Sequence, residues 1–278
     1  MTGFEALIMG VVQGLAEYLP ISSSGQLEIC NQILQLDTSG AEALQFDVTL
    51  HVATVLSTIA VLWREFSKIC TSVFSWRRDD EFWTFWKIIV SCIPVGIVGI
   101  FLKDSVEEVF GGNLTVVGIC QLITALLLLL AYFLGTRPSE EAYGKVRSES
   151  AGRPIGWIDA FVIGVAQAVA VLPGLSRSGS TIATGILLGN RRNQLAQFSF
   201  LMVIIPVLGV AFLDIVKALK GDAPTGDIGA WPLFVGFISS FVVGCIACKW
   251  MINLVKRGKL IWFSVYCVVM GIICLLWR

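Results

Sequence analysis

Charged residues are scarce in this sequence. Asp, Glu, Lys and Arg together make up 14% of the 278 residues, whereas 56% are hydrophobic and the mean hydropathy is +0.80. About a quarter of the residues in soluble domains are charged. The composition therefore excludes a soluble enzyme or binding domain and predicts an integral membrane protein.

Other absences narrow the function further. Basic and acidic residues number 20 each, so net charge gives no indication of partners. We expect the partner to be a lipid and not a nucleic acid. The cysteines lack zinc-like spacing and are predicted to be small hydrophobic residues in packed helices, including Cys245 and Cys248, about one helical turn apart. Acidic Glu5 takes the place of the basic segment of a secretory signal, so we expect no cleaved leader.

Long apolar segments recur along the chain and predict an all-α protein with six transmembrane helices. Five runs are long enough to cross a bilayer, or nearly so, and a sixth is shorter. The five are 45–62, 88–102, 116–134, 231–252 and 260–277, and the sixth is 198–213.

Two further apolar segments, residues 4–19 and 157–172, are too short to cross. As helices each would rise about 24 Å, less than the roughly 30 Å of the hydrocarbon core. Each ends at a proline followed by serines and glycines, which predicts two re-entrant helical hairpins. Non-helical backbone at that depth must be buried in protein or line a wet cavity, so both polar loops should face inward.

The basic residues are unevenly distributed between the two sides of the membrane. The count assumes that the chain starts outside and that each hairpin is followed by three crossings. Fourteen then lie on one side and four on the other, with Arg177 and Lys249 in the membrane region. The richer side is expected to be cytoplasmic, which places both termini outside.

The chain also contains an internal repeat. Residues 5–13 read EALIMGVVQ and residues 159–167 read DAFVIGVAQ, and each stretch leads to a proline, a Ser/Gly cluster and a Gln-Phe pair. The halves are 1–134 and 157–278, joined by the polar linker 135–156 within a single membrane domain, 1–278. An odd number of crossings per half turns the second half upside down. We therefore predict an inverted-topology repeat whose two loops meet near the middle of the membrane.

The first hairpin carries a carboxylate and a serine loop. Gln13 and Glu17 lie four residues apart on one helical face. An ionisable side chain inside a membrane is costly, so Glu17 is expected to be functional, the alternative being a cap or ion pair within the fold. The loop 20–25 adds three hydroxyls and free amides, although such hydroxyls often bond their own backbone.

The second hairpin carries Arg177 between two serines, followed by Gly179, Ser180 and Thr181 at the start of an apolar helical stretch. Backbone amides at a helix N-terminus, hydroxyls and a guanidinium fork together suit a phosphate group. The loop lacks the Gly-Lys-Ser/Thr ending of a Walker motif. A structural salt bridge to Glu17 is the alternative role for Arg177.

The two motifs together resemble a known family. "GVVQGLAEYLPISSSG" (10–25) is similar to the first motif of the bacterial undecaprenyl-diphosphate phosphatases of the bacitracin-resistance type, and "PGLSRSGST" (173–181) to their second. The resemblance covers essentially the whole chain. It implies a hydrolase of the bacterial plasma (inner) membrane that removes the terminal phosphate of a C55 polyprenyl diphosphate and so recycles the carrier lipid for cell-wall synthesis.

The resemblance further implies an active site that opens toward the outer face and a divalent cation, Mg²⁺ or Ca²⁺, with Glu17 as a candidate metal ligand. It leaves open whether the chain works alone or as a homodimer. The implied catalytic residues are Glu17, Ser23 and Arg177. The expected substrate-binding residues are Gln13, Ser22, Ser24, Gly25, Gln26, Gly174, Ser176, Ser178, Gly179 and Thr181.

Position 26 departs from the family pattern. The family has Ser-Gly-His where this chain has Ser24-Gly25-Gln26, and glutamine cannot exchange a proton near neutral pH. The lone histidine, His51, lies two turns into the first crossing, and we interpret it as a satisfied helix histidine. Glu17 has three candidate roles: deprotonating Ser23, deprotonating a water, or holding the metal.

A rival function belongs to another class: a carrier-lipid flippase or a non-catalytic lipid-binding protein. Inverted repeats are typical of transporters that work by alternating access. Glutamine at position 26, in place of a histidine that could exchange a proton, is consistent with a protein that has lost phosphatase activity. Release of phosphate from a prenyl diphosphate would separate this function from a phosphatase.

The departure at position 26 yields a prediction. General acid–base help is typically worth about 10²–10⁴-fold, so Gln26→His should raise the turnover rate at least about tenfold with little change in substrate affinity. Steady-state rates of phosphate release from both proteins would test this. A histidine variant that is no faster would mean that other groups already carry the proton.

Overall fold

The computed structural model describes residues 1–36, 40–101, 113–135, 152–220 and 228–277, with backbone alone at 40–41 and 213–220. Within these ranges the chain is helical and forms no named strand. Most of the linker predicted for 135–156 lies outside the described residues. The helices are α1 (Gly3–Ala16), α2 (Ser23–Leu34), α3 (Gly40–Val61), α4 (Trp63–Phe74), α5 (Asp80–Phe101), α7 (Leu114–Phe133), α8 (Trp157–Val169), α9 (Arg177–Leu187), α10 (Arg192–Lys220), α11 (Ala230–Lys256) and α12 (Ile261–Leu276).

Among the described residues, five helices are long and apolar enough to cross a membrane. They are Glu42–Val61 of α3, Asp80–Phe101 of α5, Leu114–Phe133 of α7, Arg192–Phe212 of α10 and Ala230–Lys256 of α11. This agrees with a multi-pass membrane protein. The sixth predicted span, α12, has 16 residues and is shorter than these five.

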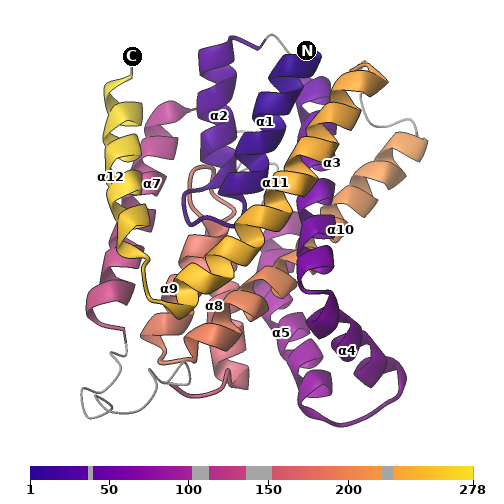
Figure 1. Ribbon diagram of the computed structural model, residues 1–278, viewed down its shortest axis with the longest axis vertical. Helices are drawn as coiled ribbons and strands as arrows, with labels where there is room; N and C mark the ends of the chain where they lie inside the picture. The colour runs from indigo at the N-terminus through magenta and orange to yellow at the C-terminus, as the bar shows by residue number, and fades with distance from the viewer. Residues whose placement is uncertain (37–39, 102–112, 136–151, 221–227, 278) are drawn as a thin grey trace.

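The two short apolar segments enter the molecule from opposite ends. In Figure 1 the α1–α2 pair occupies the end that holds the N-terminus, and the α8–α9 pair occupies the other half. Helix α1 begins with a capping box, in which Thr2 and Glu5 satisfy each other's backbone amides, and Asp159 likewise accepts from the backbone of Gly156 ahead of α8. The acidic residues of the repeat thus start both helices.

Each hairpin packs against a span from the other half of the chain. The most extensive contacts of α1 are with α11, and those of α8 are with α5. Two glycines at equivalent places in the repeat make these contacts close. A Cβ on Gly10 would lie 2.5 Å from the carbonyl oxygen of Gly236, and one on Gly164 would lie 2.3 Å from that of Ser91. Only glycine permits such backbone approach.

Two features of the helices differ from the sequence-based expectation. The segment 198–213 belongs to a much longer helix, α10, which continues to Lys220 despite Pro206. Helix α4 was not predicted, because its mixed residues resemble a loop along the sequence. Ile69 is buried, whereas the charged Arg64 and Lys68 are exposed, so the segment is an amphipathic helix.

The close seam between α1 and α11 predicts a position-specific stability loss. Gly10→Ala should lower the melting temperature in detergent, because overpacking a tight contact costs about 1–3 kcal/mol. Gly96→Ala is the matched control, since nothing lies within 4 Å of a Cβ built at Gly96. Equal melting temperatures for the two variants, followed by circular dichroism, would contradict the assigned packing.

Candidate active site

Glu17 is the centre of a cluster of polar side chains. It ends α1 as the C-cap, and its side chain is only 9% exposed. Its Oε2 accepts hydrogen bonds from Ser23 Oγ at 2.8 Å and from Gln13 Nε2 at 3.1 Å. A carboxylate at this depth is therefore not left unpaired, as its burial requires.

Arg177 supplies the opposite charge from the other half of the chain. Its Nη2 donates to Glu17 Oε1 at 2.9 Å and to Oε2 at 3.2 Å. It is the first residue of α9, whose N-cap Ser176 accepts from the amide of Gly179 at 3.0 Å. The cap fixes where α9 begins and so where the guanidinium lies.

The two polar loops meet, as the repeat predicted. The amide of Gly174 donates to Ser24 Oγ at 3.4 Å, and Ser178 Oγ donates to the carbonyl of Leu19 at 3.2 Å. A Cβ on Gly25 would lie 3.3 Å from Gly174 Cα, and Gly174 itself has a φ of +88°. Small residues on both sides allow this approach.

Some serine hydroxyls of the two loops cap helices, and one contacts the charged cluster. Ser22, which has a φ of +67°, caps α2 by accepting from the amide of Gly25 at 3.2 Å. Ser176 caps α9 in the same way. Ser23 differs from both, because its hydroxyl is bonded to a carboxylate and is therefore placed for proton transfer.

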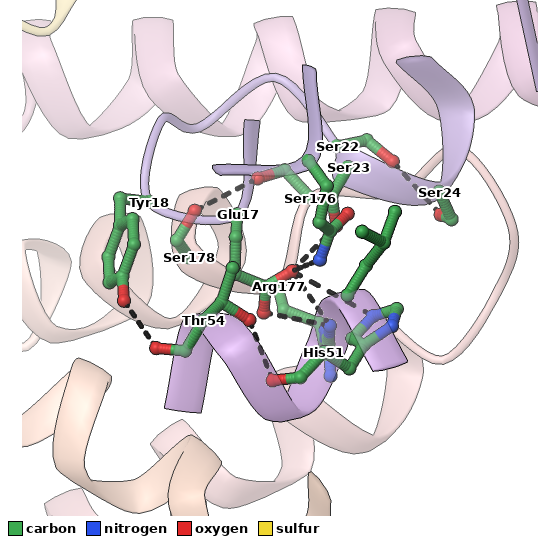
Figure 2. A network of polar contacts seen from close by, with 12 residues as sticks. Glu17, Tyr18, Ser22, Ser23, Ser24, His51, Thr54, Ser176, Arg177 and Ser178 are labelled. Carbon is green, nitrogen blue, oxygen red and sulfur yellow. Dashed lines mark hydrogen bonds and ion pairs between the residues drawn. The ribbon is translucent and has the colours of Figure 1, made fainter. Parts of the chain in front are cut away.

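His51 is satisfied within its own helix, as the sequence predicted, and it also lies beside the cluster. Its Nδ1 lies 2.8 Å from the carbonyl oxygen of Asp47, one turn earlier in α3, so Nδ1–H is the donor there. Its Nε2 lies 3.9 Å from Glu17 Oε2. Figure 2 shows Glu17, Ser23, Arg177 and His51 converging from four segments. In the sequence, the position of an ionisable residue within a predicted crossing is the feature that indicates a place in the functional site.

Two predicted substrate-binding residues have protein partners on every polar side-chain atom. Gln26 Nε2 donates to the carbonyl of Ile21 at 3.2 Å, and its Oε1 accepts from Tyr266 of α12 at 2.7 Å. Thr181 Oγ1 donates to the carbonyl of Arg177 at 2.9 Å and is fully buried. A faster Gln26→His variant therefore requires its imidazole to turn from Tyr266 toward the cluster.

A divalent cation has two oxygen donors available in this cluster. One is the Glu17 carboxylate. The other is Gln13 Oε1, which is buried and has no hydrogen-bond partner among the described residues. In those ranges no three His, Cys, Asp or Glu side chains group as metal ligands. Mg²⁺ commonly binds one or two protein oxygens and completes its shell with phosphates and water, so these residues fit a cation that shares its ligands with a phosphorylated substrate.

The arrangement suits transfer of a phosphoryl group. A hydroxyl and a guanidinium both lie within hydrogen-bonding distance of one carboxylate, and the N-terminus of α9 adds positive potential. The family model for bacitracin resistance protein BacA matches residues 6–273, which include all of these groups. The chain belongs to the BacA family.

Relatives within the BacA family are similar over almost their full length. The chain is 52% identical over 273 residues to an undecaprenyl-diphosphatase of Parabacteroides distasonis, covering 98% of this chain and 97% of the relative. The corresponding protein of Bacteroides fragilis is 51% identical over 273 residues, with the same coverage. That of Christiangramia forsetii is 41% identical over 271 residues, covering 97% and 96%. The family expected from the two motifs is confirmed.

The planar guanidinium of Arg177 yields a prediction. Its Nη2 alone contacts both oxygens of Glu17, whereas a phosphate can accept from two guanidinium nitrogens at once. Arg177→Lys should therefore lose nearly as much phosphatase activity as Arg177→Ala, because a point charge cannot replace a planar fork against a phosphate. Arg64→Lys, at an exposed site in α4, should leave the rate unchanged. Phosphate-release rates in the three variants decide it, and an Arg177→Lys protein that keeps most activity would reject the bidentate role.

The position of His51 yields another. His51→Leu should lower phosphate release by up to about fivefold, since a 3.9 Å ion-pair contact contributes about 1 kcal/mol or less. His51→Gln retains a polar amide at that place and should lose less. Full activity of the leucine variant, with normal folding, would restore the interpretation of His51 as a purely structural residue.

Proposed function

We propose that this chain is an undecaprenyl-diphosphate phosphatase. It hydrolyses the terminal phosphate of a C55 polyprenyl diphosphate and returns the monophosphate carrier lipid to cell-wall synthesis. The observation that carries the proposal is the contact of Ser23 and Arg177 with the same carboxylate, that of Glu17, in a member of the BacA family. The full-length relatives named as undecaprenyl-diphosphatases support the substrate.

Substrate binding begins with an exchange of partners at Arg177. The guanidinium now donates to Glu17, and a phosphate arriving at the α9 N-terminus offers it a doubly charged alternative. As Arg177 turns to the phosphate oxygens, Glu17 is free to accept a proton. The ion pair thus keeps both charges satisfied until a ligand replaces one of them.

The chemical step then has two candidate nucleophiles. In the first, Ser23 Oγ attacks the terminal phosphorus, its proton passes to Glu17, and the bond between that phosphorus and the bridging oxygen breaks. Undecaprenyl phosphate leaves, and water later hydrolyses the phosphoserine. In the second, a water beside Glu17 attacks directly. The 2.8 Å contact between Ser23 and Glu17 favours the first. In both, Arg177 and the loop amides stabilise charge on the phosphoryl oxygens.

A divalent cation, when bound, would supply further positive charge next to the diphosphate. Glu17 and Gln13 are the residues that would hold it, together with diphosphate oxygens and water. Gln13 also orients Glu17 through its amide nitrogen.

The topology of the proposed enzyme follows the inverted repeat. α1–α2 and α8–α9 are re-entrant hairpins, α12 is the sixth crossing, and both termini lie outside the plasma membrane. Figure 1 supports this arrangement, because the start of α1 and the end of α12 lie at the same end of the molecule. The asymmetry of basic residues supports an outside location for that end, with the site reached from the outer face.

Cysteine labelling would test this topology. A cysteine introduced in the linker 135–156 should react only from the cytoplasmic side. A cysteine at Gly111 or Gly112, which lie outside the described residues, should react only from outside. The chain without added cysteine gives the background from its eight native thiols. Labelling of the linker from outside in intact cells would contradict the inverted arrangement.

The function itself is tested by phosphate release. Purified protein in detergent would receive C55 diphosphate with magnesium or calcium, and released phosphate would be measured over time. We expect clear release by the native chain and none by Glu17→Gln, which keeps the shape of the side chain but removes the proton acceptor. Binding without release by the native chain would support the lipid-binding rival instead.

A further inference from the structure

Helix α7 contacts the helices that follow the two polar loops, α2 and α9. Two of its polar side chains, Gln121 and Thr124, are fully buried and, being three residues apart, lie on one face of the helix. Gln121 Nε2 donates to the carbonyl of Ile21 in the first loop at 2.8 Å. Thr124 Oγ1 accepts from the amide of Ser176 in the second loop at 3.1 Å. One helix therefore bonds the backbone of each loop.

The hydroxyl of Thr124 is oriented by its own helix. It donates to the carbonyl of Cys120 at 3.0 Å, so an oxygen lone pair is left for the amide of Ser176. Ser176 is the N-cap of α9 and directly precedes Arg177. The bond between Ser176 and Thr124 thus helps to set where α9 begins, and with it the base of the arginine side chain.

The carbonyl of Ile21 is held by two side-chain amides. Besides the bond from Gln121, it accepts one from Gln26 Nε2 at 3.2 Å. The next residue, Ser22, has a φ of +67°, a backbone conformation that is uncommon for residues other than glycine. Ser23 follows it as the first residue of α2. Gln121 therefore stabilises the turn that places Ser23.

Helix α7 is itself held by α12, with which it makes its most extensive contacts. A Cβ on Gly118 would lie 2.9 Å from the carbonyl oxygen of Gly271. Further along α7, Ser264 Oγ of α12 donates to the carbonyl of Ala125 at 2.9 Å. These two contacts lie on either side of the pair 121 and 124 along the helix. The segment that bonds the loops is therefore fixed against its neighbour.

We propose that Gln121 and Thr124 are positioning residues. While a phosphate is bound, they set the separation between the Ser23 hydroxyl and the guanidinium of Arg177. The proposal rests on the phosphatase function proposed above. The ion pair between Glu17 and Arg177 also joins the loops, but it is given up when the guanidinium turns to the phosphate. The bonds to α7 use only backbone atoms of the loops, so this exchange leaves them in place.

The expected effect on the reaction follows from geometry. A misplacement of about 1 Å, even one caused by a residue that does not touch the substrate, can lower a rate by about 100-fold. Because the separation of the two groups is needed once the phosphate is bound, its loss should appear in kcat and not in KM.

Variants that remove one hydrogen bond at a time test the proposal. Thr124→Val and Gln121→Leu should each lower kcat for C55 diphosphate at least about tenfold, with KM within about twofold of the native value. Thr124→Ser keeps the hydroxyl and should retain a near-native kcat. Thr71→Val is the matched control, since it removes an exposed threonine hydroxyl that donates to the carbonyl of Ser67 in α4. For either residue, a kcat equal to that of Thr71→Val, or a rise in KM alone, would overturn the proposed role.

A lost hydrogen bond can also destabilise the fold, so the melting temperature of each variant is compared by circular dichroism. If the valine or leucine variant melts early, Gln121→Asn decides. Its amide is one methylene shorter and reaches the Ile21 carbonyl only by drawing the loop toward α7. We expect its kcat to fall at least about fivefold, and a native kcat would refute the proposal. Failure of the proposed function has a different signature, since neither the native chain nor Thr71→Val would then release phosphate.

Discussion

The buried ion pair between Glu17 and Arg177 is the interaction on which the site depends. A single charge at this depth would cost several kcal/mol, and each residue removes that cost for the other. The pair also joins residues 160 positions apart, so it fixes the two hairpins relative to each other. The same contact that stabilises the fold thus brings the serine loop, the α9 N-terminus and His51 to one point.

The rest of the fold serves to bring two short hairpins deep into a helical bundle. Helices α1 and α8 have only 14 and 13 residues, and each packs along a long helix from the other half, α11 and α5 respectively. Glycine at equivalent positions of α1 and α8 permits this close packing of one helix backbone against another. The serine-rich turns can then remain non-helical, because their amides and hydroxyls bond one another across the junction.

Much of this arrangement could be predicted from the sequence, and the reasons for the failures are physical. Apolar length and the repeated motif located the short helices α1 and α8 and the meeting of the loops that follow them, since both depend on local pattern. The roles of individual polar residues depend on long-range partners. Gln26 bonds Tyr266, 240 residues away, and nothing near position 26 indicates this.

His51 and the helix α4 illustrate two other kinds of failure. The sequence predicts the satisfied helix histidine, which the bond from His51 to the Asp47 carbonyl confirms, but the approach of His51 to Glu17 depends on the packing of α3 against α1. Charged and apolar residues are mixed along α4, so the segment does not resemble a transmembrane span. Which of its residues are buried depends on the helices that pack against it.

The repeat has a further consequence at the level of symmetry. Extending the alignment of the two halves sets Val171 opposite Glu17 and Ser23 opposite Arg177. Two identical halves would have built two equivalent centres about a pseudo-twofold axis. Because the acidic residue, Glu17, lies in one half and the basic residue, Arg177, in the other, there is one centre instead. Neither half therefore carries a complete centre of its own, and the chain can perform one reaction at a time, at a single place.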